Sequence, residues 1–267
     1  MNQHQIHSPN RFRVLSMTGI LILLFVATSL MAKELSQTAS GNVAGFVAGF
    51  LLAPIIASPI EWLVHRHIYH RTNGIARRIF TIHSAHHHLY FPTWRYVTGG
   101  RARRIPILGV GVSNTQDSAL KNGVTYFAHF SFYLTLGAAF IWAPMWLLST
   151  NTVFLVGGVL ATIIISNLFI TVHDAIHRPG THPWMEARGW FHFLDDHHYI
   201  HHVDTEANVN FLLPLADWLY GSLRRELTEE EISRYGSKEV AKSRVVGAGK
   251  PARQSEMLVH RVPSPAG

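Results

Sequence analysis

Fifty-two consecutive residues, from Asn122 to His173, contain no aspartate, glutamate, lysine or arginine. An α-helix rises 1.5 Å per residue, so about 20 apolar residues cross the ~30 Å hydrocarbon core of a bilayer. The uncharged stretch is too long for one crossing, and residues 149–151 (Ser-Thr-Asn) place a polar turn near its middle. We therefore expect a helical hairpin with spans at about 126–148 and 152–171.

Two more uncharged segments lie earlier in the chain, at residues 14–32 and 41–60. The first is longer than the apolar region of a signal peptide, which favours a retained span. The second contains Pro54 and Pro59, which predict a kink or an early end of the helix. With 48% hydrophobic and only 15% charged residues, the chain is typical of a membrane protein rather than a soluble one. We expect an all-α polytopic membrane protein with four transmembrane helices.

The positive charges predict an orientation for these four spans. Four crossings place both termini and the loop between the second and third spans on one side of the membrane. That side collects 22 of the 23 lysines and arginines, and only Lys33 lies opposite. By the positive-inside rule both termini are cytoplasmic.

Histidine is abundant and cysteine is absent: the chain has 19 histidines and no cysteine. The lack of cysteine excludes disulfides, zinc-thiolate sites and thiolate-held iron-sulfur clusters. Any metal must be held by nitrogen and oxygen. Most of the histidines fall into four clusters at the predicted cytoplasmic ends of spans, HRHIYH, HSAHHH, HDAIH and HHYIHH. They predict a cytoplasmic histidine-rich helical cap.

The spacing within three clusters is typical of metal ligands on a helix. Side chains three and four residues apart share a helix face, as in His173 with His177. The same spacing recurs in two further sets, His83, His86 and His87, and His198, His201 and His202. In the first cluster His65 and His70 are five apart and diverge by about 140° on an ideal helix. Either the helix ends or bulges near His67, or His67 is the partner of His70.

Four such faces offer more ligands than one ion needs, so the pattern favours two metal ions. Imidazole suits iron, zinc and copper. Two irons beside a bilayer could activate dioxygen against an unreactive C–H bond. A non-redox zinc transporter or sensor is the alternative, but a transporter should carry polar groups at mid-membrane, where this chain has few.

Neutral imidazoles leave a strongly cationic centre, so nearby polar groups should orient and buffer the ligands. Glu61, one helical turn before His65, is the best placed carboxylate. Asn208 and Asn210, close to the last histidines, fit either a ligand-fixing role or loop structure. The candidates for this supporting role are Glu61, His67, His88, His197, Asp174, Asn208 and Asp217.

The motifs EWLVHRHIYH, HSAHH, HDAIH, HHYIHH and NVNFLLPLADWLYGSL together resemble the fatty acid hydroxylase and sterol desaturase superfamily of integral-membrane diiron oxygenases. The likeness extends from Glu61 to Leu223 and is greatest for the fatty acid alpha-hydroxylase branch. It implies two iron ions, which zinc can replace, and His70 rather than His67 as the partner of His65. The implied ligands are His65, His70, His83, His86, His87, His173, His177, His198, His201 and His202.

The resemblance also implies an activity: oxygen-dependent hydroxylation or desaturation of a lipid, with a fatty acyl chain favoured over a sterol or carotenoid. The segment before the first span is too short for the haem domain fused to many relatives. We therefore expect electrons from a separate protein, such as a b-type cytochrome or ferredoxin. The basic loop containing Arg77, Arg78 and Arg101 fits either an acidic donor or anionic lipid and topology control.

The expected organisation is a cytoplasmic N-terminus at 1–13, a membrane domain at 14–223 and a charged, largely flexible tail at 224–267. Within the tail, Thr228 and Glu231 have the spacing of a capping box and predict a short helix through about Ser233. No nucleic-acid-binding motif accompanies the basic charge, so we expect no nucleic-acid partner.

Overall fold

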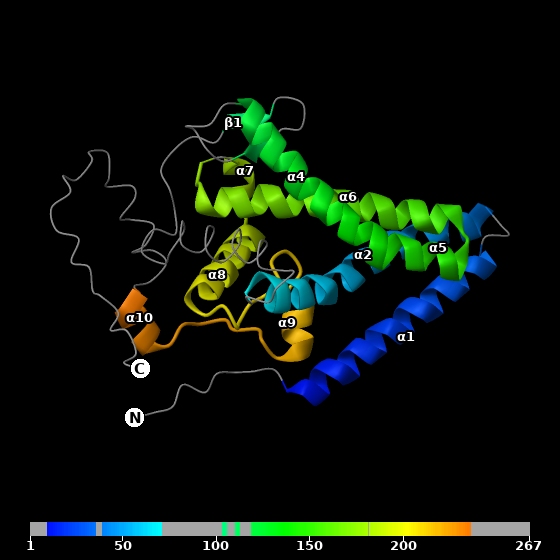
Figure 1. The fold of residues 1–267 in the computed structure, drawn as a ribbon, viewed down its shortest axis with the longest axis horizontal. Coiled ribbons are helices and arrows are strands. Elements are labelled where there is room, and N and C mark those ends of the chain that lie inside the picture. The colour runs from blue at the N-terminus through cyan, green and yellow to red at the C-terminus, as the bar shows by residue number, and fades with distance from the viewer. Residues whose placement is uncertain are drawn as a thin grey trace, which may run out of the picture.

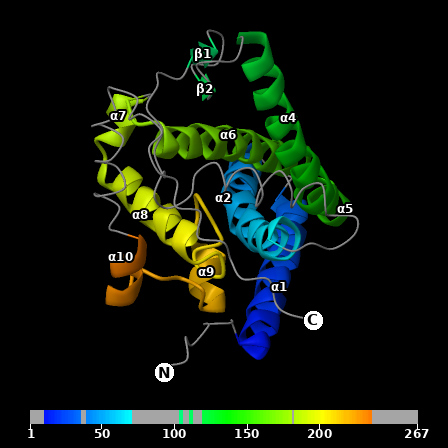
Figure 2. The same cartoon turned by 60° about the vertical axis from the view of Figure 1, so that its left-hand side comes forward.

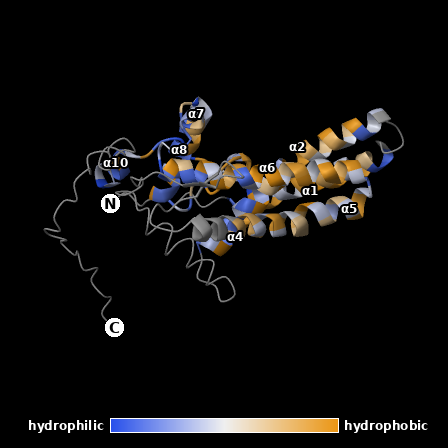
Figure 3. Ribbon diagram, turned by 90° about the horizontal axis from the view of Figure 1, so that it is seen from above, coloured by the Kyte–Doolittle hydropathy of each residue, from blue (hydrophilic) through white to orange (hydrophobic). Residues whose placement is uncertain are grey.

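The structure is a computed structural model that describes residues 10–35, 39–70, 103–105, 110–112, 119–180 and 182–235. Within these residues four helices are long and apolar enough to cross a membrane (Figure 1). Shorter helices gather beyond one end of the bundle that the four long helices form. The long helices are predominantly apolar along their length, whereas α10 and parts of α8 are polar (Figure 3). The four candidate spans are Arg11–Glu34, Ser40–Tyr69, Phe127–Ser149 and Thr152–His177.

The first two spans are longer than the sequence predicted. Helix α1 (Arg11–Leu35) begins inside the expected N-terminal segment 1–13. Helix α2 (Ala39–Val64) continues through both of its prolines, so the predicted early end is wrong. It runs directly into a π-helical turn, η1 (His65–Tyr69). This continuity places the first histidine cluster at the end of a membrane helix.

The third span is interrupted by a second π-helical turn. It consists of α4 (Ala119–Gly137), η5 (Ala138–Trp142) and α5 (Ala143–Ser149). Pro144 explains the interruption, because proline has no N–H to donate and its ring clashes with the carbonyl four residues earlier. That carbonyl belongs to Phe140, inside the wider turn, where the helix can absorb the clash.

The polar turn expected at residues 149–151 is present and well capped. Thr150 adopts a left-handed conformation and ends α5. The Asn151 side chain accepts hydrogen bonds from the backbone N–H groups of Val153 and Phe154, which begins α6 (Thr152–His177). Its amide also donates to the Ala32 carbonyl at 2.7 Å, tying the hairpin to α1. A single residue therefore caps one helix and fixes its neighbour.

Helices α2 and α6 approach until their backbones touch. A Cβ atom on Gly157 would lie 2.2 Å from the carbonyl oxygen of Phe46, and one on Gly49 would lie 2.0 Å from that of Phe154. Small residues let membrane helices pack this closely. On α2 they recur at every fourth position, as Gly45, Gly49, Ala53 and Ala57.

The expected all-α class is confirmed, and one short pair of strands is the exception within the described residues. Strands β1 (Arg103–Ile105) and β2 (Val110–Val112) form an antiparallel pair, with Arg103 opposite Val112. Isoleucine and valine in these strands are β-branched and favour extended structure. The remaining elements are short helices, α7 (Pro183–Glu186), α8 (Gly189–Val203), α9 (Leu215–Tyr220) and α10 (Glu229–Tyr235).

Helix α9, in the segment after α8, lies beside α1 and α2 (Figure 2), and polar side chains join them. Arg13 of α1 donates to the carbonyls of Trp218 and Leu219 at 2.8 and 2.6 Å. These carbonyls are at the C-terminal end of α9, where the helix dipole favours a cation. The Trp62 indole donates to the Ser222 hydroxyl at 2.9 Å. The segment after α8 and the four long helices therefore form one packed unit.

The start of the predicted flexible tail is ordered. Thr228 and Glu231 form the expected reciprocal capping box, with the Glu231 N–H donating to the Thr228 hydroxyl and the Thr228 N–H to the Glu231 carboxylate. Helix α10 follows and extends to Tyr235, two residues beyond the prediction. The tail from residue 236 onward lies outside the described residues.

Candidate metal centre

Seven of the ten predicted ligands lie in the described part of the chain, and they form two neighbouring groups. The second cluster, His83, His86, His87 and His88, lies outside the described residues. The two groups bring together α2 and η1, the end of α6, and α8. These elements are far apart in the sequence and meet at one end of the bundle.

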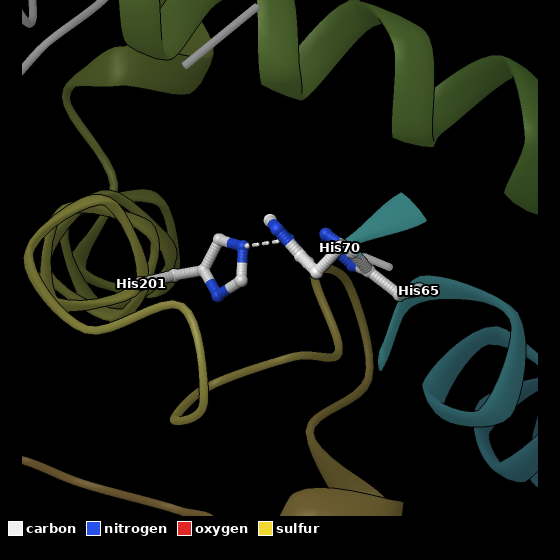
Figure 4. A group of neighbouring side chains, drawn as sticks. All are labelled: His65, His70 and His201. Atoms are coloured by element: carbon white, nitrogen blue, oxygen red, sulfur yellow. Dashed lines mark hydrogen bonds between the residues drawn. The ribbon is translucent and has the colours of Figure 1, made fainter. Parts of the chain in front are cut away.

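The first group contains His65, His70 and His201 (Figure 4). The π-helical turn explains how residues five apart meet, because it holds more residues per turn than an α-helix and brings positions i and i+5 nearer to alignment. The His65 and His70 rings stack with centroids 5.0 Å apart. His201 reaches them from α8, with its Nε2 at 3.2 Å from Nε2 of His70.

His67 points elsewhere. Its ring packs edge-on against Trp62 at a centroid distance of 5.9 Å. Of the alternatives that helix geometry left open, the structure therefore has the bulge, with His70 beside His65.

The second group contains His173, His177 and His198, with His202 alongside. Nε2 of His198 lies 3.1 Å from Nε2 of His177 and 3.1 Å from Nε2 of His202. The HHYIHH cluster on α8 is therefore divided between the groups, since His201 belongs to the first. The rings of His198 and His201 are 6.0 Å apart, so the two groups are adjacent.

The spacing of the nitrogens fits metal coordination. Ligand nitrogens about 2.1 Å from one ion, at tetrahedral or octahedral angles, are ~3.0–3.4 Å from each other. The nitrogen pairs His70–His201 and His177–His198 fall in this range, at 3.2 and 3.1 Å. Each group can therefore hold a metal ion by its nitrogens.

Burial keeps the imidazoles in the form that binds metal. Burial, together with the nearby His201 and Arg66, lowers the pKa of His70 to about 3. Burial also lowers the pKa of His201 to about 4, against the opposing effect of its hydrogen bond to Ala207. Both rings are neutral at pH 7, and a neutral imidazole has a lone pair to donate.

A backbone carbonyl fixes the tautomer of His201. Its Nδ1 donates to the Ala207 carbonyl at 2.8 Å, which leaves Nε2 directed at His70. Arg66, buried in η1, binds the Glu206 carboxylate and donates to the Glu206 carbonyl at 2.8 Å. The loop after α8 is thus joined to the first group from two directions.

Arg224 supports the same loop from its other side. Its guanidinium pairs with Asp204 at 2.8 Å and with Glu231 at 2.7 Å. The backbone N–H of Arg224 donates to the side-chain oxygen of Asn208. The hydrogen bond from Arg224 lowers the pKa of Glu231 to about 2 from its usual 4.5. The C-terminal helix therefore helps to hold the loop that carries Ala207.

The low pKa of Glu231 predicts how stability changes with pH. A carboxylate with a lowered folded-state pKa stabilises the fold above its unfolded pKa, and the contribution is lost as pH falls toward 2. We expect Glu231→Gln to lower the thermal midpoint at pH 7 and to differ less and less from wild type below pH 4.5. Thermal unfolding in detergent between pH 7 and pH 3 measures this. An equal gap at both ends would contradict it.

The predicted supporting residues in the described part of the chain mostly bind backbone groups of neighbouring loops rather than the histidines. Glu61 accepts from the Phe211 N–H at 2.8 Å and from the Asn210 amide at 3.3 Å, so in the described residues it positions a loop rather than a histidine. Phe211 in turn packs against His173 and His198, at ring distances of 5.3 and 5.1 Å. Asp174, between two ligand histidines on α6, is buried and pairs with Arg178.

Asp217, Asn208 and Asn210 build the loop itself. The fully buried Asp217 accepts from the backbone N–H groups of Val209 and Asn210 and from the Ser222 hydroxyl. Asn208, at φ +50°, links the His197 carbonyl to Arg224. Nε2 of His197 donates to the Asn210 carbonyl at 2.6 Å and lies 3.5 Å from Asp217. The contacts of Asn208 and Asn210 therefore indicate a role in loop structure.

An apolar cavity of about 100 Å³ begins beside the first group and runs into the bundle. Its lining includes His65, Glu61, Tyr69, Tyr133 and Phe169. Tyr69 packs against His65 at 5.3 Å, and Phe169 stacks on His173 at 6.0 Å, so the cavity reaches the first group and Phe169 separates it from the second. Sequence reasoning missed Arg66, Tyr69, Tyr133 and Phe169. Only Arg66 and Tyr69, within the first histidine cluster, carried a signal that could have found them.

No family model, no curated protein and no solved structure matches this chain.

Proposed function

We propose that this protein is a membrane-bound, non-haem diiron oxygenase that hydroxylates or desaturates a lipid, as a member of the fatty acid hydroxylase and sterol desaturase superfamily. One observation supports this above all: two adjacent groups of largely buried histidines meet at the end of an apolar helical bundle, with an apolar cavity leading to the first of them. Nitrogen-only donors suit iron, zinc and copper. Two irons held there would supply the reactivity toward dioxygen that an unactivated C–H bond requires.

The protein's own residues have three tasks in this proposal. The histidines of both groups hold and tune the metal, with His83, His86 and His87 completing the set. The cavity lining binds the apolar substrate and excludes water from it. Glu61, Asp217 and the two loop asparagines keep Phe211 and the carbonyl of Ala207 in place against the ligands. Preorganised support of this kind keeps ligand geometry fixed during turnover.

Lipid mass spectrometry of cells with and without the protein tests the proposed reaction. We expect a lipid heavier by one oxygen, or lighter by two hydrogens, only where the wild-type protein, a reductant source and iron are present. A His201→Ala variant expressed at the same level should yield none. Bound zinc together with an unchanged lipid profile would favour the non-redox alternative.

We also propose that both termini and the metal centre face the cytoplasm, because 22 of 23 lysines and arginines fall on that side of four crossings. A reporter fused after Gly267 should then be cytoplasmic, and one inserted at residue 37, between the first two spans, should be on the opposite side. The reverse pattern would contradict the orientation. The electron donor, a separate protein, would dock on the same cytoplasmic side.

A further inference from the structure

The cavity beside His65 has two chemically different ends. It lies between α2, η1, α4, η5 and α6, inside the membrane-spanning part of the bundle. Along α2 its lining runs from Ala53 through Ala57 and Ile60 to Glu61 and His65. Helix α6 runs parallel to α2, with its histidines also at its C-terminal end, so Thr162 lies at the deep end and Phe169 at the histidine end. The polar groups of the lining are concentrated at the histidine end.

The deep end is apolar. Ile141, which is only 3% exposed, and Ala53 form part of it. The hydroxyl of Thr162 is already used, since it donates to the Gly158 carbonyl at 2.8 Å and receives the Trp142 indole N–H at 3.1 Å. Thr162 points its methyl group at Gly137, where a Cβ atom would lie 2.6 Å away. A ligand therefore meets only hydrocarbon there.

The histidine end offers hydrogen-bonding groups. The hydroxyls of Tyr69 and Tyr133 hydrogen-bond each other, and the Glu61 carboxylate and the His65 ring lie in the same lining. Tyr133 packs on Phe169 at 4.9 Å, which joins this end to the second histidine group. A bound molecule thus has a favourable direction, with its apolar end deep and its functional end toward the histidines.

The size of the cavity restricts the shape of that molecule. An apolar protein cavity of about 150 Å³ accommodates one benzene ring. This cavity has about 100 Å³, which is too little for the fused rings of a sterol or the end ring of a carotenoid. A polymethylene chain is one carbon wide and can enter as a short stretch, with the rest of the chain outside.

We propose that this cavity binds the methyl-terminal stretch of a single unbranched hydrocarbon chain, as in a long-chain fatty acid or acyl lipid, with Ile141 and Thr162 as its floor. This inference deepens the proposed function and rests on it for the chemistry, although the binding site itself is defined by the cavity. Ile141 and Thr162 are then the residues that set how far a chain extends past the metal centre.

Photolabelling tests the site without turnover. The probe is palmitic acid carrying a diazirine near its methyl end, added to purified protein in phosphatidylcholine nanodiscs without reductant. We expect labelled residues at the deep end of the cavity, and competition by unlabelled palmitic acid but not by cholesterol. Ala57→Phe and Ser166→Leu, which both fill the cavity, should each reduce labelling about tenfold. Two filling variants on different helices guard against a folding defect in one.

The matched control is Gly19→Phe on α1, where a Cβ atom meets nothing within 4 Å. It adds the same side chain as Ala57→Phe and should label like wild type. Labelling that survives in both filling variants would overturn the proposal, and so would cholesterol that competes as well as palmitic acid.

A second measurement tests the floor. Ile141→Ala should deepen the cavity and shift competition from palmitic toward stearic acid by several-fold, whereas Leu147→Ala, at a position 78% exposed, should not. An unchanged length preference would contradict the assigned direction. Labelling of the cavity in a protein that never oxidises lipid would contradict the proposed oxygenase alone. Oxidation with no labelling of the cavity would contradict the chain site alone.

Discussion

Replacing His198 with alanine should remove the metal bound by the second group and abolish lipid oxidation. His198 is the central residue of the second group, because its Nε2 lies 3.1 Å from the Nε2 atoms of both His177 and His202. Without it, His177 loses the α8 nitrogen that lies 3.1 Å from its own, although the His202 ring remains 5.0 Å from the His177 ring. Loss of a residue that merely supports a ligand costs 10–100-fold in metal affinity, so loss of the ligand should cost roughly 100-fold or more. Elemental analysis of purified protein measures the metal retained per chain.

The control for this variant lies on the same helix. His192 of α8 is exposed and belongs to neither group, so His192→Ala removes an imidazole without touching the centre. It should keep the wild-type metal content and product yield. Because His201 lies in the other group, His198→Ala should also retain more metal than His198→Ala combined with His201→Ala. Equal metal in wild type and His198→Ala would rule out the second group as a metal site.

The membrane helices were predictable because they depend on properties that a single sequence records. Charge-free length predicted four apolar helices, and the polar residues at 149–151 predicted the hairpin turn that Asn151 caps. The close contact of α2 with α6 was missed, although the four-residue spacing of Gly45, Gly49, Ala53 and Ala57 was a visible signal for it. The early end at the prolines of α2 was wrong, because packing against neighbouring helices keeps the helix continuous.

The gathering of the seven described histidines was predictable from the sequence, but their division into two groups was not. Helical spacing treats the α8 cluster as one face, yet His198 and His201 point to different partners, His177 and His70. That division depends on where α2 and α6 end relative to α8, which the spacing within one cluster does not contain. The π-helical turn at His65 likewise remained one of two alternatives. Long-range contacts decide both features.

The supporting residues were less predictable still. Glu61 was placed beside His65 by helical periodicity, and it does lie there. Its carboxylate turns instead to the backbone of Phe211, 150 residues later in the chain. The cavity combines side chains of three helices, and Tyr133 gives no sign in the sequence of meeting Tyr69. Residues of this kind are identified only after the helices have been packed.

Gly157→Leu should destabilise the protein more than any substitution of a ligand. The side chain would start from a Cβ atom 2.2 Å from the Phe46 carbonyl oxygen and 3.0 Å from the Phe50 nitrogen. Both neighbours are backbone atoms of α2, so no rotamer change can relieve the clash and the two helices must separate. We expect a loss of roughly 3 kcal/mol in the free energy of unfolding, measured by denaturant titration in detergent.

Separation of α2 from α6 should also disrupt the candidate metal centre. His65 follows directly from α2 and His173 lies on α6, so separating these helices moves the two groups apart, and bound metal should fall even though every histidine is intact. Gly19→Leu is the matched control, because it adds the same side chain to a helix glycine whose surroundings are open within 4 Å. It should leave both stability and metal content unchanged. A Gly157→Leu protein with wild-type stability would mean that α2 and α6 are not in backbone contact, and the arrangement of the two histidine groups would then have to be reconsidered.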